Sequence, residues 1–154
     1  MKIILITKPD SKYGKLYGEG LLGLHNELYD DQHEKLDQLN GRQGFSRISA
    51  LTDVWDVGTL CACAVDDDNR PVGFITFSYT KQGNRFLWVH NFFVHEAHRS
   101  SGVGQTLIDT VRDYGKSKGC KWMQLTVLDN NSRAIAFYER YGFRTEYQDM
   151  VKEL

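Results

Sequence analysis

Apolar residues recur along this chain with two different periods, and these periods predict most of its elements. Runs rich in aliphatic, β-branched or aromatic residues predict strands at residues 3–6, 59–65, 72–79 and 86–94. The acidic turn 66–69 joins two of these runs as an antiparallel hairpin. Between Val103 and Tyr114 the apolar positions are spaced by four, four and three residues, which predicts a helix that reaches about Lys118.

The N-terminal part of the chain has a weaker helical pattern. Leucines recur near helical spacing from Ser11 to about Leu39, but glycines at positions 18, 20 and 23 interrupt them. We therefore expect one or two imperfect helices in this segment. A loop over residues 40–58 should follow it.

The C-terminal part of the pattern predicts a strand, a helix and a second strand. Residues 122–128 alternate between apolar and polar positions, as a strand does. Residues 130–132 are N-cap candidates for a helix that runs to Tyr141 and is closed by Gly142. The last strand should begin near Arg144.

This element order predicts an α/β fold, or an α+β fold, built on a mixed sheet. A helical crossover links the strands at 86–94 and 122–128, which makes them parallel neighbours. A chain of 154 residues is long enough for one core and too short for two. We therefore expect a single domain over residues 1–154.

Composition and charge narrow the class of protein. Apolar residues make up 41% of the chain and charged residues 25%, as in ordinary globular proteins. The net charge of −1 gives no support to nucleic-acid binding, which needs a clustered positive surface. The apolar run 3–6 is too short for a signal peptide or a membrane span, so we expect a cytoplasmic protein with no membrane partner.

The cysteines favour free thiols. Cys61, Cys63 and Cys120 are odd in number and lack CxxC spacing, which fits a reducing compartment. Cys61 and Cys63 share one face of a predicted strand, where cysteine usually acts as a small hydrophobic residue. A metal site would need further ligands that the sequence does not supply, so we expect no metal.

The stretch HRSSGVG, residues 98–104, lies where the strand at 86–94 gives way to the next helix. A helix N-terminus has unpaired N–H groups and the positive end of the helix dipole, so it binds anions where side chains leave room. Gly102 and Gly104 provide that room, and Arg99 adds a donor suited to phosphate oxygens. The same glycines would also serve a tight connection that binds no ligand.

Two motifs resemble those of one known family. RSSGVG matches the Q/R-x-x-G-x-G/A pattern of the GCN5-related N-acetyltransferase (GNAT) family, and NSRAIAFYERYGF, residues 131–143, is similar to its second signature, N-x-x-A-x-x-F-Y-x-x-x-G-F. Both occur in the family's order and spacing. The resemblance covers 86–143 strongly and 1–58 only loosely, and it implies a GNAT-like fold with a mostly antiparallel sheet, a splayed parallel strand pair and flanking helices.

In such enzymes acetyl-CoA lies between the splayed strands, and its pyrophosphate meets the glycine loop. The resemblance therefore implies cofactor contacts by the backbone of Phe92, Phe93 and Val94, by Arg99, Ser100, Ser101, Gly102, Val103, Gly104 and Gln105 around the pyrophosphate, and by Asn131 near the pantetheine arm. On sequence grounds Asn131 is about equally suited to capping its own helix.

The same resemblance implies roles in acetyl transfer. Tyr138 aligns with the tyrosine of the second signature, which implies a general acid for the leaving thiolate; without the motif, it would be part of an apolar helix face. His90 occupies a position where some related enzymes carry a base, and period two places it on the face of Phe92 and Val94. A strand histidine is more often structural, and deprotonation through water stays open. Other family members use a glutamate where this chain has Thr126, and the implied oxyanion donor is the N–H near Val94.

The implied function is an acetyl-CoA-dependent N-acetyltransferase acting on a small amine, a polyamine, an amino sugar or a protein amine. The acceptor would meet residues 11–58 and the loop 80–85. Acidic residues of the first helical region would attract a cation or form a solvated helix face: Glu27, Asp30, Asp31, Glu34 and Asp37. The alternative is a catalytically silent acyl-CoA-binding module that regulates or binds a partner. Exposed Trp55 and Trp88 would suit a homodimer.

Overall fold

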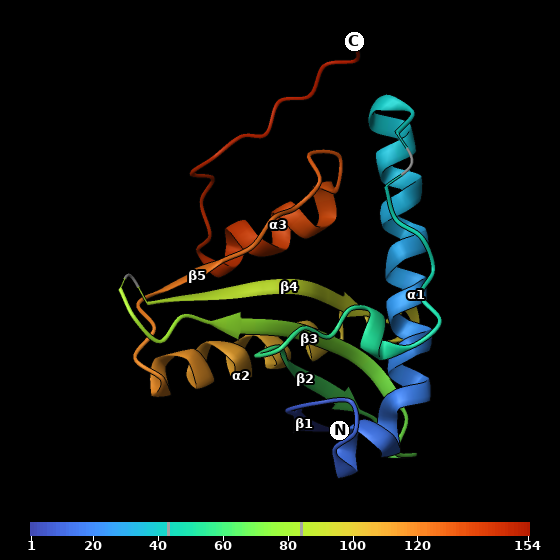
Figure 1. The fold of residues 1–154 in the computed structure, drawn as a ribbon, viewed down its shortest axis with the longest axis vertical. Helices are drawn as coiled ribbons and strands as arrows, with labels where there is room; N and C mark the ends of the chain where they lie inside the picture. The colour runs from blue at the N-terminus through green and yellow to red at the C-terminus, as the bar shows by residue number, and fades with distance from the viewer. Residues whose placement is uncertain (43, 84) are drawn as a thin grey trace.

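A five-stranded sheet with helices on both faces forms the protein (Figure 1). The computed structural model describes residues 1–42, 44–83 and 85–154. Its strands are β1 (Lys2–Ile6), β2 (Leu60–Val65), β3 (Pro71–Tyr79), β4 (Phe86–Val94) and β5 (Trp122–Gln124). Its helices are α1 (Lys12–Asn40), α2 (Val103–Ser117) and α3 (Ser132–Tyr141), with short 3₁₀ turns η1 (Leu51–Asp53) and η2 (Glu96–His98). The strand order is β1-β2-β3-β4-β5, and only the pair β4–β5 is parallel. The predicted mixed sheet is confirmed.

β4 and β5 separate after a short paired stretch. Residues 86–88 of β4 pair with residues 122–124 of β5, whereas β4 continues along β3 as far as Val94. The strand predicted over 122–128 is therefore too long, because the chain leaves the sheet after Gln124. The loop that follows is tethered to α1 by a hydrogen bond from Asn130 Nδ2 to the Lys35 carbonyl (2.8 Å). One edge of β4 is consequently open beyond residue 88.

The sheet separates two hydrophobic clusters. The cluster under α1 contains Ile6, Tyr17, Leu21, Leu24, Leu28, Leu51, Cys61, Cys63, Val65, Phe74 and Phe93. The cluster under α2 contains Ala62, Ala64, Val72, Ile75, Phe77, Leu87, Val89, Val103, Leu107, Ile108 and Val111, and aromatic residues of α3 pack against it. Because successive side chains of a strand point to opposite faces of the sheet, the central strands contribute residues to both clusters.

Cys61 and Cys63 are buried thiols of the α1-side cluster, and neither forms a disulfide. Burial raises the pKa of both, that of Cys63 to about 12. Both thiols are therefore protonated at neutral pH and act as the small hydrophobic residues that the sequence predicts.

α1 is one continuous helix of 29 residues, so of the one or two helices expected for this segment a single one forms, and its glycines do not interrupt it. Ser11 caps its first turn, because the Ser11 hydroxyl accepts a hydrogen bond from Gly14 N–H (3.1 Å). Gly20 allows close packing, since a Cβ there would lie 2.8 Å from Pro71 Cγ at the start of β3. Tertiary packing here outweighs the low helix propensity of glycine. Among the described residues, neither α1 nor any other helix combines the length and apolarity needed to traverse a bilayer.

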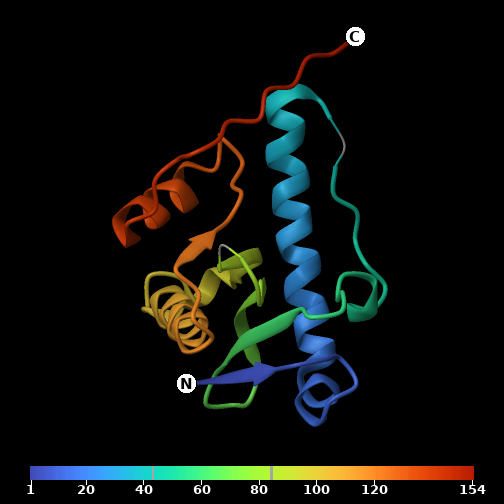
Figure 2. The same ribbon diagram turned by 60° about the vertical axis from the view of Figure 1, so that its left-hand side comes forward.

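The last strand, predicted from about Arg144, is not formed. Residues 144–154 carry no regular structure and lead away from the sheet (Figures 1 and 2). Tyr147 and Met150 are 79% and 94% exposed. A strand is stable only when it pairs with a neighbour and covers a core with one face, and this segment does neither.

The two tryptophans expected to be exposed are both half-buried. Trp55 packs against the α1-side cluster and donates from Nε1 to the Thr59 carbonyl (2.9 Å). Trp88 stacks on Phe86, with ring centroids 5.3 Å apart. The argument for a homodimer from these side chains is therefore lost, although Trp122 is 55% exposed.

Candidate functional site

The loop between β4 and α2 presents backbone N–H groups. Ser100 and Gly102 adopt the left-handed region, with φ of 62° and 86°. Gly102 is the N-cap of α2, and no side chain caps that end of the helix. Within the described part of the chain, the N–H groups of residues 100–105 have no acceptor, and the first bond of the helix runs from Thr106 N–H to the Gly102 carbonyl (3.0 Å). This run of donors at a helix N-terminus is an arrangement that binds anions.

Most polar side chains predicted to assist this loop are already engaged inside the protein. The Ser101 hydroxyl donates to the His98 carbonyl (2.6 Å), and the Gln105 amide donates to Asp109 (3.1 Å). Arg99 donates from Nε to the Val94 carbonyl (2.9 Å). Ser100 is exposed, whereas the Val103 side chain is buried in the α2-side cluster. Apart from the Ser100 hydroxyl and the Nη groups of Arg99, the free donors of the loop are therefore the main-chain N–H groups.

The open edge of β4 adds backbone groups beside the loop. His95 N–H donates to the Val72 carbonyl of β3 (2.9 Å). Because successive residues of a strand direct their backbone groups to opposite neighbours, Phe92 and Val94 direct theirs to the open edge, and Phe93 directs its own to β3. The bond from Arg99 to the Val94 carbonyl agrees with this assignment. Of the three residues whose backbone contacts the resemblance implies, Phe92 therefore has both backbone groups on the open edge, and Val94 has its N–H there, while the Val94 carbonyl already accepts from Arg99.

Tyr138 lies on the α2 side of β4 within a group of aromatic rings. Its ring centroid is 5.6 Å from those of Phe137 and Phe143 and 6.2 Å from that of Phe92. Burial among these rings raises the pKa of Tyr138 to about 12. The phenol is therefore protonated at neutral pH. Among the described residues, none forms a hydrogen bond with its hydroxyl.

α3, which carries Tyr138, is fixed at both ends. Asn131 caps it by accepting from Ala134 N–H (3.4 Å), so the capping role weighed for Asn131 is present. Near the other end, the Tyr141 hydroxyl donates to Asp109 of α2 (2.8 Å), which also accepts from Arg112 (2.6 Å). These hydrogen bonds join α3 to the helix whose N-terminus carries the free donors.

The alternation of a regular strand predicts that His90 faces the same side of β4 as Phe92 and Val94. In the structure His90 faces the other side. Thr76 pairs with Asn91 and Phe77 pairs with Val89, so His90 is the extra residue of a β-bulge. A bulge breaks the alternation of side chains. Phe92 and Val94 face α2, whereas the His90 ring lies 2.8 Å from Ser78 Oγ on the α1 face.

The charge state of His90 is set by two opposing effects. Loss of hydration lowers its pKa below the ordinary value of 6.5, and the charge of Asp56 raises it. The lowering effect is the larger, so the ring is mostly neutral at pH 7 and is able to accept a proton.

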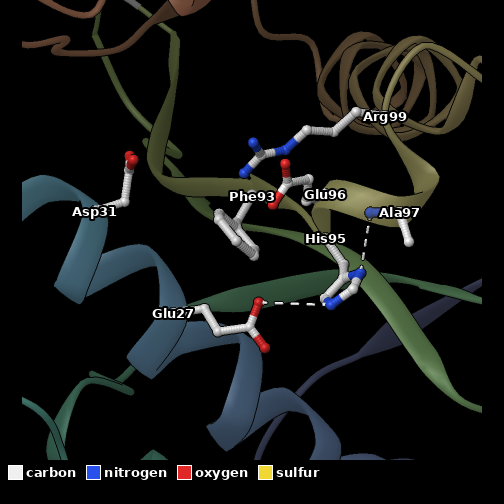
Figure 3. A pocket seen from close by; sticks show the side chains of 7 residues that line it. All are labelled: Glu27, Asp31, Phe93, His95, Glu96, Ala97 and Arg99. Carbon is white, nitrogen blue, oxygen red and sulfur yellow. Dashed lines mark hydrogen bonds and ion pairs between the residues drawn. The ribbon is translucent and has the colours of Figure 1, made fainter.

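An open pocket lies on the same α1 face, at the carboxyl end of β4 (Figure 3). Its volume is about 460 Å³, and its lining residues are Glu27, Asp31, Phe93, His95, Glu96, Ala97 and Arg99. Phe93 lies at its centre, and the Arg99 guanidinium lies over that ring, 5.5 Å from the ring centroid. His95 Nδ1 accepts from Ala97 N–H (3.2 Å), and His95 Nε2 lies 3.9 Å from Glu27 Oε2.

The sequence did not predict that these residues share a pocket. It assigned no role to His95 or Glu96. Glu27 and Asp31 stood among five acidic residues of one helix, with nothing to separate them from Asp30, which pairs with Arg47 (2.7 Å) away from the pocket. The only available signal was their spacing of four residues, which places both on one side of a helix.

A comparison with protein families matches most of the chain. Residues 24–143 match the model described as the acetyltransferase (GNAT) family. This range includes the glycine loop, the open edge of β4 and all of α3. The two short motifs therefore lie within one continuous family match.

Individual relatives agree with the family match. The thialysine N-ε-acetyltransferase of Bos taurus is 33% identical over 70 residues, which are 46% of this chain and 41% of that protein. The chain thus spans less than half of the length of this relative. In solved structures, the tetramutant of the BH1408 protein from Bacillus halodurans has a TM-score of 0.80 at 18% identity, covering both chains completely. The aminoglycoside N-acetyltransferase AAC(6')-Iy, in complex with CoA, has a TM-score of 0.68 at 19% identity over 99% of this chain and 98% of the other. At these identities the structural likeness shows the fold.

Proposed function

Since this chain belongs to the acetyltransferase (GNAT) family, we propose that it transfers an acetyl group from acetyl-CoA to a primary amine by direct attack. The observation that carries this proposal is the run of free N–H groups at residues 100–105 beside the open edge of β4. Neither feature alone indicates coenzyme A. Together they offer donors to a diphosphate and, next to them, a strand edge to an amide-containing chain.

The residues present fit this cofactor. A Cβ added at Gly102 would meet no atom within 4 Å, so the N-terminus of α2 is accessible. The backbone groups of Phe92 and Val94 would pair with the pantetheine arm as a neighbouring strand does, and the N–H groups of residues 100–105 would hold the pyrophosphate. When bound, acetyl-CoA supplies an activated acetyl group and a thiol leaving group. A backbone N–H on the open edge, at Val94 or Phe92, would stabilise the oxyanion.

Tyr138 is the proposed general acid. Its phenol holds a proton at Oη on the α2 side of β4, where it would be donated to the leaving sulfur. A pKa of about 12 exceeds the ordinary thiol value of about 8.5. The apolar rings that raise the pKa of Tyr138 would also destabilise a thiolate placed among them, which reduces this difference.

His90 is the proposed base. An aliphatic amine with a pKa of about 10.4 is neutral in only about one molecule in 10³ at pH 7, so it must lose a proton before it attacks. His90 lies on the α1 face, across β4 from Tyr138. The amine would therefore approach from one face of the strand while the thiol departs on the other.

The test combines binding and turnover. We expect calorimetry to detect acetyl-CoA binding, and we expect thiol release in the presence of a primary amine. Tyr138→Phe should lower kcat by about 10²-fold or more without changing the Kd for acetyl-CoA, because general acid catalysis contributes about 10²–10⁴-fold. Tyr147→Phe, in the exposed tail, is the matched control.

The possible results separate the alternatives. Binding of acetyl-CoA without turnover of any amine would indicate an acyl-CoA-binding module. Absence of binding would overturn the proposal entirely. Full activity of Tyr138→Phe would remove only the tyrosine from the mechanism.

A further inference from the structure

Asp109 of α2 is the centre of a hydrogen-bond network between α2 and α3. Its Oδ1 accepts from the Tyr141 hydroxyl of α3 (2.8 Å) and from Arg112 (2.6 Å), and its Oδ2 accepts from the Gln105 amide (3.1 Å). Arg112 also donates to the Tyr141 oxygen (3.1 Å). Both carboxylate oxygens are therefore used, and their partners include the first turn of α2 and the end of α3.

The groups of this network have the protonation states that it requires at neutral pH. The hydrogen bonds from Gln105 and Tyr141, together with the charge of Arg112, lower the pKa of Asp109, so its carboxylate is ionised. Burial and the hydrogen bond to Asp109 raise the pKa of Tyr141 to about 12, so its hydroxyl keeps the proton that it donates. The bond between the two helices is therefore charge-assisted, and such bonds are stronger than those between neutral groups.

α3 depends on this network because its packing alone holds it weakly. None of its ten residues is fully buried. Its N-cap bond, from Ala134 N–H to Asn131, lies within the same segment and does not attach the helix to its surroundings. Among the described residues, the hydrogen bonds of Tyr141 are the ones that join a side chain of α3 to another helix or strand. Loss of the acceptor at Asp109 should therefore displace this end of α3.

The end of α3 that Asp109 holds also carries Tyr138. Phe143 N–H donates to the Tyr138 carbonyl (2.9 Å), which folds the chain back over the last turn of the helix. The Phe143 ring packs against both tyrosines, with its centroid 6.0 Å from that of Tyr141 and 5.6 Å from that of Tyr138. A displacement of Tyr141 is therefore transmitted to Tyr138 through one turn of helix and one shared ring.

We propose that Asp109 is a positioning residue, which holds Tyr138 above β4 by binding the Tyr141 hydroxyl. This inference rests on the proposed acetyltransferase function and adds a residue to its mechanism. Asp109 acts through α3 and does not touch the reacting atoms. Because Asp109 lies one turn after Gln105, the same carboxylate fixes α3 relative to the N-terminus of α2, where the diphosphate would bind. The proton donor and the diphosphate site are thereby fixed to one helix.

The experiment measures kcat and the KM for acetyl-CoA in variants of position 109. Asp109→Ala removes the acceptor, and kcat should fall about 10-fold at unchanged KM, because a displacement of about 1 Å costs up to about 10²-fold in rate. Asp109→Asn keeps an oxygen acceptor for Tyr141 and should recover most of this loss. Asp113→Ala is the matched control, since Asp113 also accepts from Arg112 of α2 (2.9 Å) but has no bond to α3 among the described residues.

A second set of variants separates positioning from a general effect on the fold. In the Tyr138→Phe protein, Asp109→Ala should cause no further loss in kcat, since the group that it positions is absent. It should still lower the free energy of unfolding, as it does in the wild type. An equal fall in kcat in both backgrounds, full activity of Tyr138→Phe, or an equal loss in Asp113→Ala would overturn the proposal.

Failure of the proposed function would be recognised separately. If the wild-type protein acetylates no amine, the measurement is the NMR signal of the Tyr138 ring in protein made with isotopically labelled tyrosine, identified by its absence from Tyr138→Phe. A shift of this signal in Asp109→Ala that is much smaller in Asp109→Asn and in Asp113→Ala would support the link between Asp109 and Tyr138. A signal at the same position in all three variants, or equal shifts in all three, would overturn it.

Discussion

The two faces of β4 near its carboxyl end are built in different ways. On the α2 face and the open edge, the groups available to a ligand are backbone N–H groups of residues 92, 94 and 100–105, with Tyr138 above them. On the α1 face they are side chains, namely Glu27, Phe93, Glu96 and Arg99. The bulge at His90 separates the two, because it turns that ring to the α1 face while Phe92 stays on the other.

This difference explains why one region is readable from sequence and the other is not. A site made of main chain needs glycines and a helix start within a few consecutive residues, and such a requirement leaves a short motif. A pocket made of side chains draws on α1, which ends at Asn40, and on η2, which begins at Glu96, so its residues are far apart along the chain. A short motif can therefore locate the main-chain region, whereas no single stretch of sequence locates the side-chain pocket.

The largest effect is expected from a substitution in the glycine loop between β4 and α2, where the available groups are backbone N–H groups. Gly102 has a φ of 86°, which a β-branched residue adopts only with strain, so Gly102→Val should displace the N–H groups around it. We expect the Kd for acetyl-CoA to rise about 10- to 100-fold, the loss associated with one or two hydrogen bonds to a charged group. Calorimetry measures this change.

Gly23→Val is the matched control, since a Cβ at this exposed position of α1 would meet no atom within 4 Å. Its Kd should equal that of the wild type. An unchanged Kd in Gly102→Val would show that the loop does not hold the cofactor, and the contrast between the two faces would lose its main support.

The next effect concerns the layer beneath α1. His25 is fully buried, stacks on Phe74 (4.0 Å between centroids) and donates from Nδ1 to the Leu21 carbonyl (3.0 Å). Its Nε2 has no partner among the described residues. Burial lowers the pKa of His25 below 6.5, so the unfolded chain binds the proton more tightly than the folded one.

Stability should therefore fall as the pH drops below 6.5, by at most about 1.4 kcal/mol per pH unit until the folded-state pKa is reached. Urea unfolding at pH 7.5, 6.5 and 5.5 measures this loss. His25→Phe removes the titrating group and should flatten the profile, whereas His98→Gln, near the surface, should leave it steep. Parallel profiles for wild type and His25→Phe would contradict the assignment.

Most of the fold could be predicted from periodicity. β4 and α2 begin where the pattern places them, because strong alternation and helical spacing agree there with local turn residues. The pattern left open whether the N-terminal segment forms one helix or two, and tertiary contacts decide it, because Gly20 packs against Pro71 and α1 is unbroken. The strand predicted from about Arg144 fails because this segment has no partner strand among the described residues.

The site could be predicted only in part, for similar reasons. The motif located the N–H groups of the glycine loop and the aromatic position of Tyr138, both of which follow from local sequence. It did not reveal that the Gln105 amide is hydrogen-bonded to Asp109, nor that a bulge turns the His90 side chain to the α1 face. A bulge depends on the register between two strands, which a single strand's pattern does not contain.

A smaller effect should follow from loosening α3. Tyr141→Phe removes the hydrogen bond to Asp109 that joins α3 to α2. We expect a loss of about 1 kcal/mol in the free energy of unfolding, measured by urea denaturation. If Tyr138 must be held above β4, kcat should also fall while the KM for the amine is unchanged. A change confined to that KM would mean that the two faces do not act separately.

The smallest expected effect is a shift in pH dependence. The charge of Asp56 raises the pKa of His90, so Asp56→Asn should lower it. If His90 is the base, the acidic limb of kcat/KM, which reports the loss of its neutral form, should move to lower pH by a fraction of a unit. Asp68→Asn, in the turn between β2 and β3, is the control that should leave the limb in place. If the acidic limb does not move in Asp56→Asn but is lost in Glu27→Gln, the base is Glu27 of α1 and not His90.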